Sequence, residues 1–275
     1  MKRAEIVKQI REKKSFLCVG LDSDIRKIPS HLMECADPVF EFNKQIIDEV
    51  APYSVALKPN LAFYESQGAE GWRSLERTVL YARENYPELF LIADAKRGDI
   101  GNTSALYARA FFDQMQFDAI TVAPYMGSDS VSPFLQFDGK WIIVLAVTSN
   151  AGADNFQFKQ SEGKLLYEWV LHESSKWGNE GNIMYVAGAT RPEMFSDIRK
   201  IVPGHFLLVP GVGAQGGDLQ AVAKYGMTDE CGLLVNASRS IIFANGGTDF
   251  ANAAGIEAKK LQQEMEILLQ QKGII

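Results

Sequence analysis

Three charged residues stand within six positions of one another at the end of an apolar segment. Asp94, Lys96 and Asp99 occur in the sequence ADAKRGDIGNT, directly after the apolar run LFLIA at 89–93. Side chains alternate along an extended segment, so Asp94 and Lys96 face the same side of it. Removing an ion from water costs several kcal/mol even after relaxation, and packing alone therefore explains these residues poorly. An ammonium group flanked by carboxylates can stabilise charge that develops during a reaction. An internal ion-pair network with a helix cap is the alternative.

A second group of residues has the composition of an anion site. The segment PGVGAQGGD at 210–218 is rich in glycine and precedes a predicted helix, so its backbone N–H groups can converge on an anion. Arg239 follows the next apolar segment, in NASRSI at 236–241. A guanidinium group suits phosphate because its donors form a planar fork. We expect a phosphate site here, with an ordinary glycine-rich loop as the alternative.

Eight apolar segments alternate with longer amphipathic ones and predict the fold. The spacing between most of them, roughly 20–40 residues, is what strand–helix–strand units need. Nearly continuous apolar strands indicate burial on both faces, as in parallel sheets. The sequence therefore predicts an α/β protein whose parallel strands close into a single-domain (β/α)8 TIM barrel. An open doubly wound sheet is the alternative, but no GxGxxG motif follows the first apolar segment. The predicted strands are 15–21, 53–58, 89–94, 118–122, 141–147, 182–187, 205–210 and 231–236.

A single barrel domain at 1–275 is predicted, because no internal repeat, low-complexity tract or linker divides the chain. Residues 1–14 are charged and amphipathic, and we expect them to form an N-terminal surface helix. The ligand site of such a barrel lies at the carboxyl ends of its strands. Asp22, Lys58 and Asp94 stand at the ends of the first three predicted strands and would therefore share one face. Further helices are predicted at 37–50, 69–86, 101–115, 163–177, 191–200, 216–225 and 247–271.

Composition excludes several other kinds of protein. The chain of 275 residues is 47% hydrophobic and 23% charged, which is typical of globular proteins. A formal net charge of −6 argues against nucleic acid or an anionic membrane as the main partner. Cys18, Cys35, Cys231 and the three histidines have neither the spacing of a disulfide framework nor that of a metal site. We therefore predict a reduced, cytoplasmic protein without a Cys/His metal site.

The motif DAKRGDIGNT resembles the D-x-K-x-x-D signature of the orotidine 5′-monophosphate (OMP) decarboxylase family. Further segments resemble the strand ends of that family and follow in the same order along residues 17–241. The length of the chain and the wording DAKRGD resemble the longer bacterial type of the family. The segments that carry the resemblance beside the motif are LCVGLD, ALKPN, TVAPYMGSD, AVTSN, PGVGAQGGD and NASRSI.

The resemblance implies decarboxylation of OMP to UMP and CO2 in de novo pyrimidine biosynthesis, without a metal or an organic cofactor. By the family pattern, Lys96 donates a proton to C6 of the pyrimidine, and Asp94 lies beside the carboxylate of the substrate. Lys58 belongs to an alternating charge network and contacts the ribose, and Asp22 accepts a hydrogen bond from a ribose hydroxyl. Asp99 crosses a twofold interface into the partner's site, so the resemblance implies a homodimer.

The resemblance also implies contacts to the base and to the phosphate. Ser149 corresponds to a contact at the pyrimidine edge, and Gln215 to a bridge between base and phosphate. Arg239 corresponds to the phosphate clamp. The remaining substrate-binding candidates are Asn60, Thr103 and Gly216.

Two other functions are compatible with parts of the pattern. Metal-dependent sugar-phosphate decarboxylases and synthases of the same superfamily share D-x-K-x-x-D, but they carry a Glu at the strand-two position that helps bind Mg2+. Lys58 occupies that position here, and its charge would repel a divalent ion. A non-catalytic nucleotide-binding barrel is the second alternative. Lys96 between Asp94 and Asp99 is hard to explain in a protein that only binds.

Overall fold

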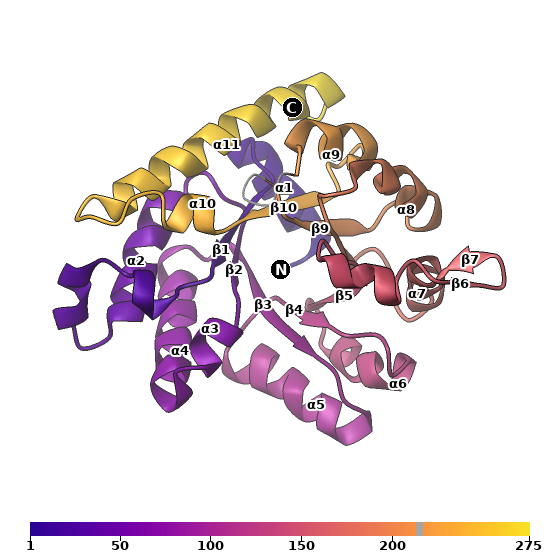
Figure 1. The fold of residues 1–275 in the computed structure, drawn as a ribbon, viewed down its shortest axis with the longest axis horizontal. Coiled ribbons are helices and arrows are strands. Elements are labelled where there is room, and N and C mark those ends of the chain that lie inside the picture. The colour runs from indigo at the N-terminus through magenta and orange to yellow at the C-terminus, as the bar shows by residue number, and fades with distance from the viewer. Residues whose placement is uncertain (213–216) are drawn as a thin grey trace.

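Eight parallel strands form a closed barrel in the computed structural model, which describes residues 1–212 and 217–275 (Figure 1). Around the barrel the strands follow the order β1-β10-β9-β8-β5-β4-β3-β2. The predicted (β/α)8 TIM barrel is confirmed. The barrel strands are β1 (Leu17–Leu21), β2 (Ala56–Pro59), β3 (Phe90–Arg97), β4 (Ala119–Val122), β5 (Trp141–Val147), β8 (Ile183–Ala187), β9 (Phe206–Pro210) and β10 (Leu233–Ala237).

The barrel strands are continuous in apolar residues because both of their faces are covered. Every residue of β1, β2, β4, β8 and β10 is buried. One face packs inside the barrel and the other against the surrounding helices. The predicted strand at 53–58 begins three residues later, at Ala56, and β3 continues to Arg97 rather than ending at residue 94. The strand therefore carries Lys96 as well as Asp94.

The helices form a ring around the barrel (Figure 1). The start of α2 shows why the sequence folds this way locally, since the side chain of Asp37 accepts a hydrogen bond from the N–H of Phe40 and Pro38 occupies the first turn. Within the described residues, no helix is both long and apolar enough to cross a membrane. The helices are α1 (Arg3–Lys13), α2 (Pro38–Val50), α3 (Ala62–Glu65), α4 (Gly68–Asn85), α5 (Gly101–Arg109), α6 (Ser128–Val131), α7 (Leu166–Ser174), α8 (Phe195–Ile201), α9 (Leu219–Gly226), α10 (Arg239–Ile242) and α11 (Phe250–Lys272).

Two predicted helices differ from the observed ones. The helix predicted at 163–177 begins only at Leu166, because the residues before it form a small hairpin of β6 (Gln160–Ser161) and β7 (Lys164–Leu165). This hairpin projects from the ring of helices (Figure 1). The helix predicted at 101–115 is α-helical to Arg109 and continues as one π-helical turn to Gln114.

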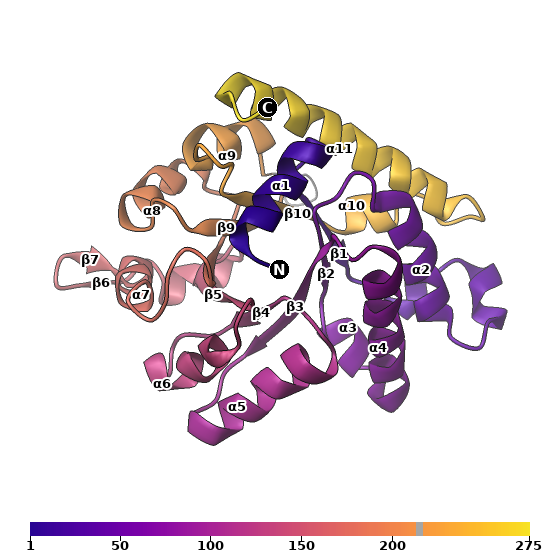
Figure 2. The same cartoon turned by 180° about the vertical axis from the view of Figure 1, so that it is seen from behind.

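Helix α1 lies across the end of the barrel opposite to the carboxyl ends of the strands (Figure 2). Its residues Ile6, Val7 and Ile10 are buried, while its other face is charged. The helix therefore shields apolar residues at the amino ends of the strands from water. It occupies most of the predicted helix at 1–14.

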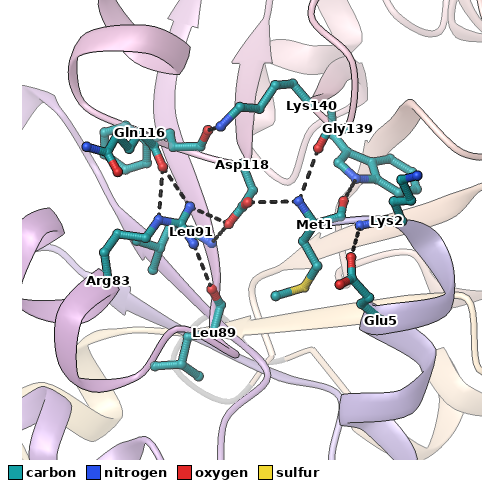
Figure 3. A network of polar contacts seen from close by, with 12 residues as sticks. Met1, Lys2, Glu5, Arg83, Leu89, Leu91, Gln116, Asp118, Gly139 and Lys140 are labelled. Carbon is teal, nitrogen blue, oxygen red and sulfur yellow. Dashed lines mark hydrogen bonds and ion pairs between the residues drawn. The ribbon is translucent and has the colours of Figure 1, made fainter.

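A buried polar network holds this end of the barrel together (Figure 3). The α-amino group of Met1 donates to Asp118 Oδ1 and to the carbonyl of Gly139, each at 3.1 Å. The second carboxylate oxygen of Asp118 accepts hydrogen bonds from Arg83 Nη2 at 2.5 Å and from the backbone N–H of Leu91 at 2.9 Å. Asp118 thus joins the amino terminus, α4, β3 and the start of β4, far from the ligand end of the barrel.

Candidate active site

A pocket of about 340 Å³ opens at the carboxyl ends of the barrel strands. This is the end at which α/β barrels place their ligand sites. The pocket contains residues from both predicted groups, the charged one and the phosphate-binding one. The predicted residues that line it are Asp22, Lys58, Asn60, Asp94, Lys96, Ser149 and Arg239.

The floor of the pocket carries a row of alternating charges. Lys58 Nζ on β2 lies 2.8 Å from Asp94 Oδ2 on β3. Lys96 Nζ lies 2.7 Å from Asp94 Oδ1. Lys58 and Asp94 are buried, whereas half of the Lys96 side chain is exposed, 50% against 10% for Asp94. The Lys96 ammonium is therefore the more exposed of the two, and the carboxylate that it contacts is also held by the buried ammonium of Lys58.

Burial and charge act in opposite directions on this row. Burial alone would raise the pKa of Asp94, but Lys58 and Lys96 outweigh it and hold the pKa well below its usual range. Burial alone would lower the pKa of Lys58, but Asp94 and Asp22 outweigh it and raise the pKa above its usual value. Asp94 is therefore an anion and Lys58 a cation throughout the neutral pH range.

One carboxylate oxygen in the pocket wall is left unsatisfied. Asp22 Oδ1 is buried and has no hydrogen-bond partner among the described residues. A buried acceptor without a donor costs about 1–3 kcal/mol, so a donor supplied by a ligand would relieve this cost. A sugar hydroxyl is such a donor.

Arg239 stands at the other side of the pocket, at the start of α10. Its side chain has no ion pair with any residue in the described part of the chain, so the guanidinium group is available to an anion. Gly211 and Val212 of the glycine-rich segment also line the pocket. Gln215 and Gly216, predicted for the same site, lie outside the described residues.

Ser238 and Asn236 line the pocket and were missed in the sequence analysis, although both are in the quoted segment NASRSI. Asn236 Nδ2 donates to Ser238 Oγ at 3.1 Å. Ser238 packs so closely on Gly20 of β1 that a Cβ atom at residue 20 would lie 1.9 Å from Ser238 Oγ. A glycine near the carboxyl end of β1 is therefore required for the position of Ser238, which directly precedes Arg239.

The segment after β5 forms a third wall. Thr148, Ser149 and Asn150 line the pocket. The side chain of Gln157 holds this wall, since it accepts a hydrogen bond from the N–H of Thr148 at 2.9 Å and donates to Thr148 Oγ1 at 2.8 Å. Asn150 accepts a hydrogen bond from the same hydroxyl at 2.6 Å.

Asp99 and Thr103 are predicted site residues that do not line the pocket of their own chain. The carboxylate of Asp99 accepts a hydrogen bond from the N–H of Ile100 at 2.7 Å, and Thr103 is exposed in the first turn of α5. The charge row within one chain therefore ends at Lys96. Exposed apolar side chains accompany these two residues, with Ile100 55% and Leu106 52% exposed.

Metal ligands are sparse in the part of the chain that the structure describes. No group of three or more His, Cys, Asp or Glu side chains there could hold a metal ion. Among the charged side chains of the pocket, Lys58 is stabilised by the negative charges of both Asp94 and Asp22.

The fold and the site together define a (β/α)8-barrel protein with a lysine–aspartate–lysine row at the carboxyl ends of its strands. Residues 15–254 match the family described as orotidine 5'-phosphate decarboxylase / HUMPS family. The chain belongs to this family, as the sequence motifs predicted.

Individual relatives agree with this assignment. The chain is 59% identical to orotidine 5'-phosphate decarboxylase of Phocaeicola vulgatus over 98% of its own length and 99% of the relative's. It is 58% identical to the enzyme of the same name from Flavobacterium johnsoniae, over 99% of this chain and 100% of the relative. Among solved structures, OMP decarboxylase of Leishmania donovani superposes with a TM-score of 0.80 at 34% identity and covers 96% of this chain and 99% of its own.

Proposed function

We propose that this chain decarboxylates OMP to UMP and CO2 in pyrimidine biosynthesis, in the pocket that contains Lys58, Asp94 and Lys96. The observation that carries the proposal is the row of two ion pairs, at 2.8 and 2.7 Å, which presents one ammonium group to the pocket. Relatives named for this activity resemble the chain over almost its whole length and support the proposal.

The chemistry requires a fixed cation rather than an electron sink. When the bond between C6 and the carboxylate breaks, the electron pair stays on C6, in an orbital that the ring π-system cannot delocalise. The Lys96 ammonium stabilises this developing charge and then transfers a proton to C6, which yields UMP. The neutral amine regains its proton from water. Preorganised charge of this kind is commonly the largest contribution to catalysis, and slow uncatalysed reactions demand a barrier reduction of up to ~20 kcal/mol.

Asp94 has two roles in this mechanism. Its carboxylate holds the Lys96 ammonium in place, so that the cation does not have to reorganise during the reaction. It also lies beside the carboxylate of the bound substrate and repels it, and this repulsion disappears as neutral CO2 forms. Both roles require an anion, which is consistent with the lowered pKa of Asp94.

The other pocket residues bind the substrate. Asp22 accepts a hydrogen bond from a ribose hydroxyl through its unsatisfied oxygen, and Lys58 contacts the ribose beside it. Arg239 binds the phosphate together with the glycine-rich loop, in which Gln215 and Gly216 take part. The remaining contacts are those of Ser149 at the pyrimidine edge and of Asn60. Binding of these remote groups can contribute to the rate if it is expressed in the transition state.

A homodimer completes the site in this proposal. Asp99 and Thr103 lie outside the pocket of their own chain, so a second copy would have to bring them to Lys96. The exposed side chains of Ile100 and Leu106 near them are the kind of apolar surface that marks interaction sites. The shared site would extend the charge row by one carboxylate.

A cytoplasmic location belongs to the same proposal. Cys18, Cys35 and Cys231 are free thiols in the structure. Free thiols are typical of reducing compartments.

Absorbance of OMP, followed with EDTA present, tests the function. We expect OMP to be consumed and UMP to form. Lys96→Ala should lower turnover roughly 10³-fold or more, because it removes both the cation and the proton donor, and it should keep the affinity for UMP within about tenfold. Lys176→Ala is the matched control, since that lysine is exposed just after the end of α7 and pairs with Glu173.

The alternatives give different results in the same assay. Activity that disappears with EDTA would indicate the metal-dependent sugar-phosphate class. Tight binding of UMP without consumption of OMP would indicate a nucleotide-binding barrel. Near wild-type turnover in Lys96→Ala would refute the role of that lysine.

A further inference from the structure

Thr121 is a buried residue that contacts both Asp94 and Lys96 of β3, and its role is not explained by packing. It lies on β4 at the pocket, 1% exposed. Its hydroxyl donates to Asp94 Oδ1 at 3.0 Å and accepts a hydrogen bond from the backbone N–H of Lys96 at 2.8 Å. A single side chain on the neighbouring strand therefore contacts both residues of the ion pair.

The strand pairing shows why β3 needs this contact. Ala93 pairs with Ile120, but the next pair is Arg97 with Val122. Three residues of β3 thus lie opposite the single residue Thr121 of β4, which is a bulge in the ladder. A bulge leaves backbone groups without their usual partners, and the Thr121 hydroxyl takes the place of the missing carbonyl for the N–H of Lys96.

The backbone of Lys96 is in an uncommon conformation within this bulge. Its φ is +47°, in the left-handed region that residues other than glycine rarely adopt. Such a conformation is unfavourable in itself and persists where the surroundings hold it. The hydrogen bond to Thr121 is one such restraint, and it fixes the point from which the Lys96 side chain starts.

We propose that Thr121 is a positioning residue for catalysis, whose hydroxyl holds the bulge of β3 and the carboxylate of Asp94 so that the Lys96 ammonium is aimed at the reacting carbon. This inference rests on the proposed function. Because the hydroxyl oxygen accepts from the N–H of Lys96, its one proton is directed at Asp94 Oδ1. The same oxygen of Asp94 binds Lys96 Nζ at 2.7 Å. The Thr121 hydroxyl thus binds the backbone of Lys96 directly, and it holds the carboxylate that binds the Lys96 ammonium.

Thr121→Val tests the proposal, because it keeps the shape of the side chain and removes only the hydroxyl. A hydrogen bond to a charged group is worth about 1.5–3 kcal/mol, so we expect kcat to fall roughly 10- to 100-fold. KM and the affinity for UMP should stay within about threefold, because Thr121 binds the catalytic pair and not the ribose or phosphate. Thr121→Ser retains the hydroxyl and should keep kcat within about threefold of wild type.

Thr78→Val is the matched control. Thr78 is also buried, and its hydroxyl also donates one hydrogen bond, to the carbonyl of Ser74, and accepts one, from Asn43. It lies on α4, so its loss should lower stability without lowering kcat. If Thr121→Val does not fold, Thr121→Cys, with a thiol as a weak donor, replaces it with the same expected loss of kcat.

The kcat values of the Thr121 variants decide whether the inference holds. Wild-type kcat in Thr121→Val or its replacement would overturn the inference, and so would a Thr121→Ser variant as slow as Thr121→Val, since retention of the hydroxyl would then not preserve kcat. These outcomes are separate from a failure of the proposed function, in which the wild-type chain itself would not decarboxylate OMP.

Discussion

Asp94 accepts hydrogen bonds from two ammonium groups and one hydroxyl while it is buried within β3. Its own desolvation is offset by these donors, and it is also the anion that makes the burial of Lys58 tolerable. The pair is coupled, and removing either partner leaves an uncompensated charge in the interior.

Asp94→Asn should lower the free energy of unfolding at pH 7 by roughly 3–5 kcal/mol, because the buried Lys58 ammonium loses its partner. The wild-type fold raises the pKa of Lys58, so its contribution is present below the unfolded pKa and is lost only as pH rises through the folded one. The variant gives up that proton at a lower pH. The stability gap between variant and wild type should therefore narrow as pH rises from 7 to 10.

Urea unfolding at several pH values measures this gap. Glu173→Gln is the control, because the exposed pair of Glu173 with Lys176 contributes little. A gap that stays constant across the pH range would mean that Asp94 does not control the protonation of Lys58.

At the scale of elements, the close contact between β1 and the segment after β10 determines the position of Arg239, the proposed phosphate-binding residue of the pocket. Gly20 is the residue that permits it. A Cβ atom there would lie 2.9 Å from Ser238 Cβ and 3.2 Å from Asn236 Oδ1, as well as against Ser238 Oγ. Rotation of the serine hydroxyl removes only one of these contacts, so the backbone of the loop would have to move.

Gly20→Ala should therefore lower stability by about 1–3 kcal/mol, as expected for overpacking, and raise the KM for OMP, because Arg239 follows Ser238 directly. Thermal unfolding and steady-state kinetics measure the two effects. Gly246→Ala is the control, since a Cβ atom at Gly246 meets no atom within 4 Å. Unchanged stability together with an unchanged KM in Gly20→Ala would show that the loop yields without cost.

At the scale of the whole molecule, the two ends of the barrel have separate tasks. The amino end is closed by α1 and by the network around Asp118 (Figures 2 and 3). The carboxyl end carries the pocket, and Asp99 is not among the residues that line it. The contacts that close the barrel thus lie apart from the pocket, and in the proposed dimer a second chain supplies the last carboxylate of the motif.

Mixing two inactive variants tests the shared site. Lys96→Ala and Asp99→Ala chains should each be inactive as homodimers. A heterodimer would contain one site with both native residues, so we expect activity to return to at most half of the wild-type value per dimer. Lack of recovery in purified heterodimers would mean that Asp99 acts within its own chain or has no catalytic role.

The order of the elements and the family could be predicted from the sequence, because both depend on local patterns. Apolar runs separated by amphipathic segments predict strands and helices, and Asp94 and Lys96 share a side through the alternation of an extended chain. Barrels bind ligands at the carboxyl ends of their strands, which predicts that Asp22, Lys58 and Arg239 lie together. These three residues line one pocket, as expected.

The other features of the site depend on closure of the barrel, because closure brings together residues that are far apart in the sequence. Thr121 meets Asp94 and Lys96 only because β4 pairs with β3 across a bulge, and the left-handed φ of Lys96 has no signal in the sequence. The missing donor at Asp22 Oδ1 and the contact of Gly20 with Ser238 also depend on atoms far apart in the chain. Residue types and their spacing thus determined the chemistry available to this protein, and long-range packing determined which of those groups face one another.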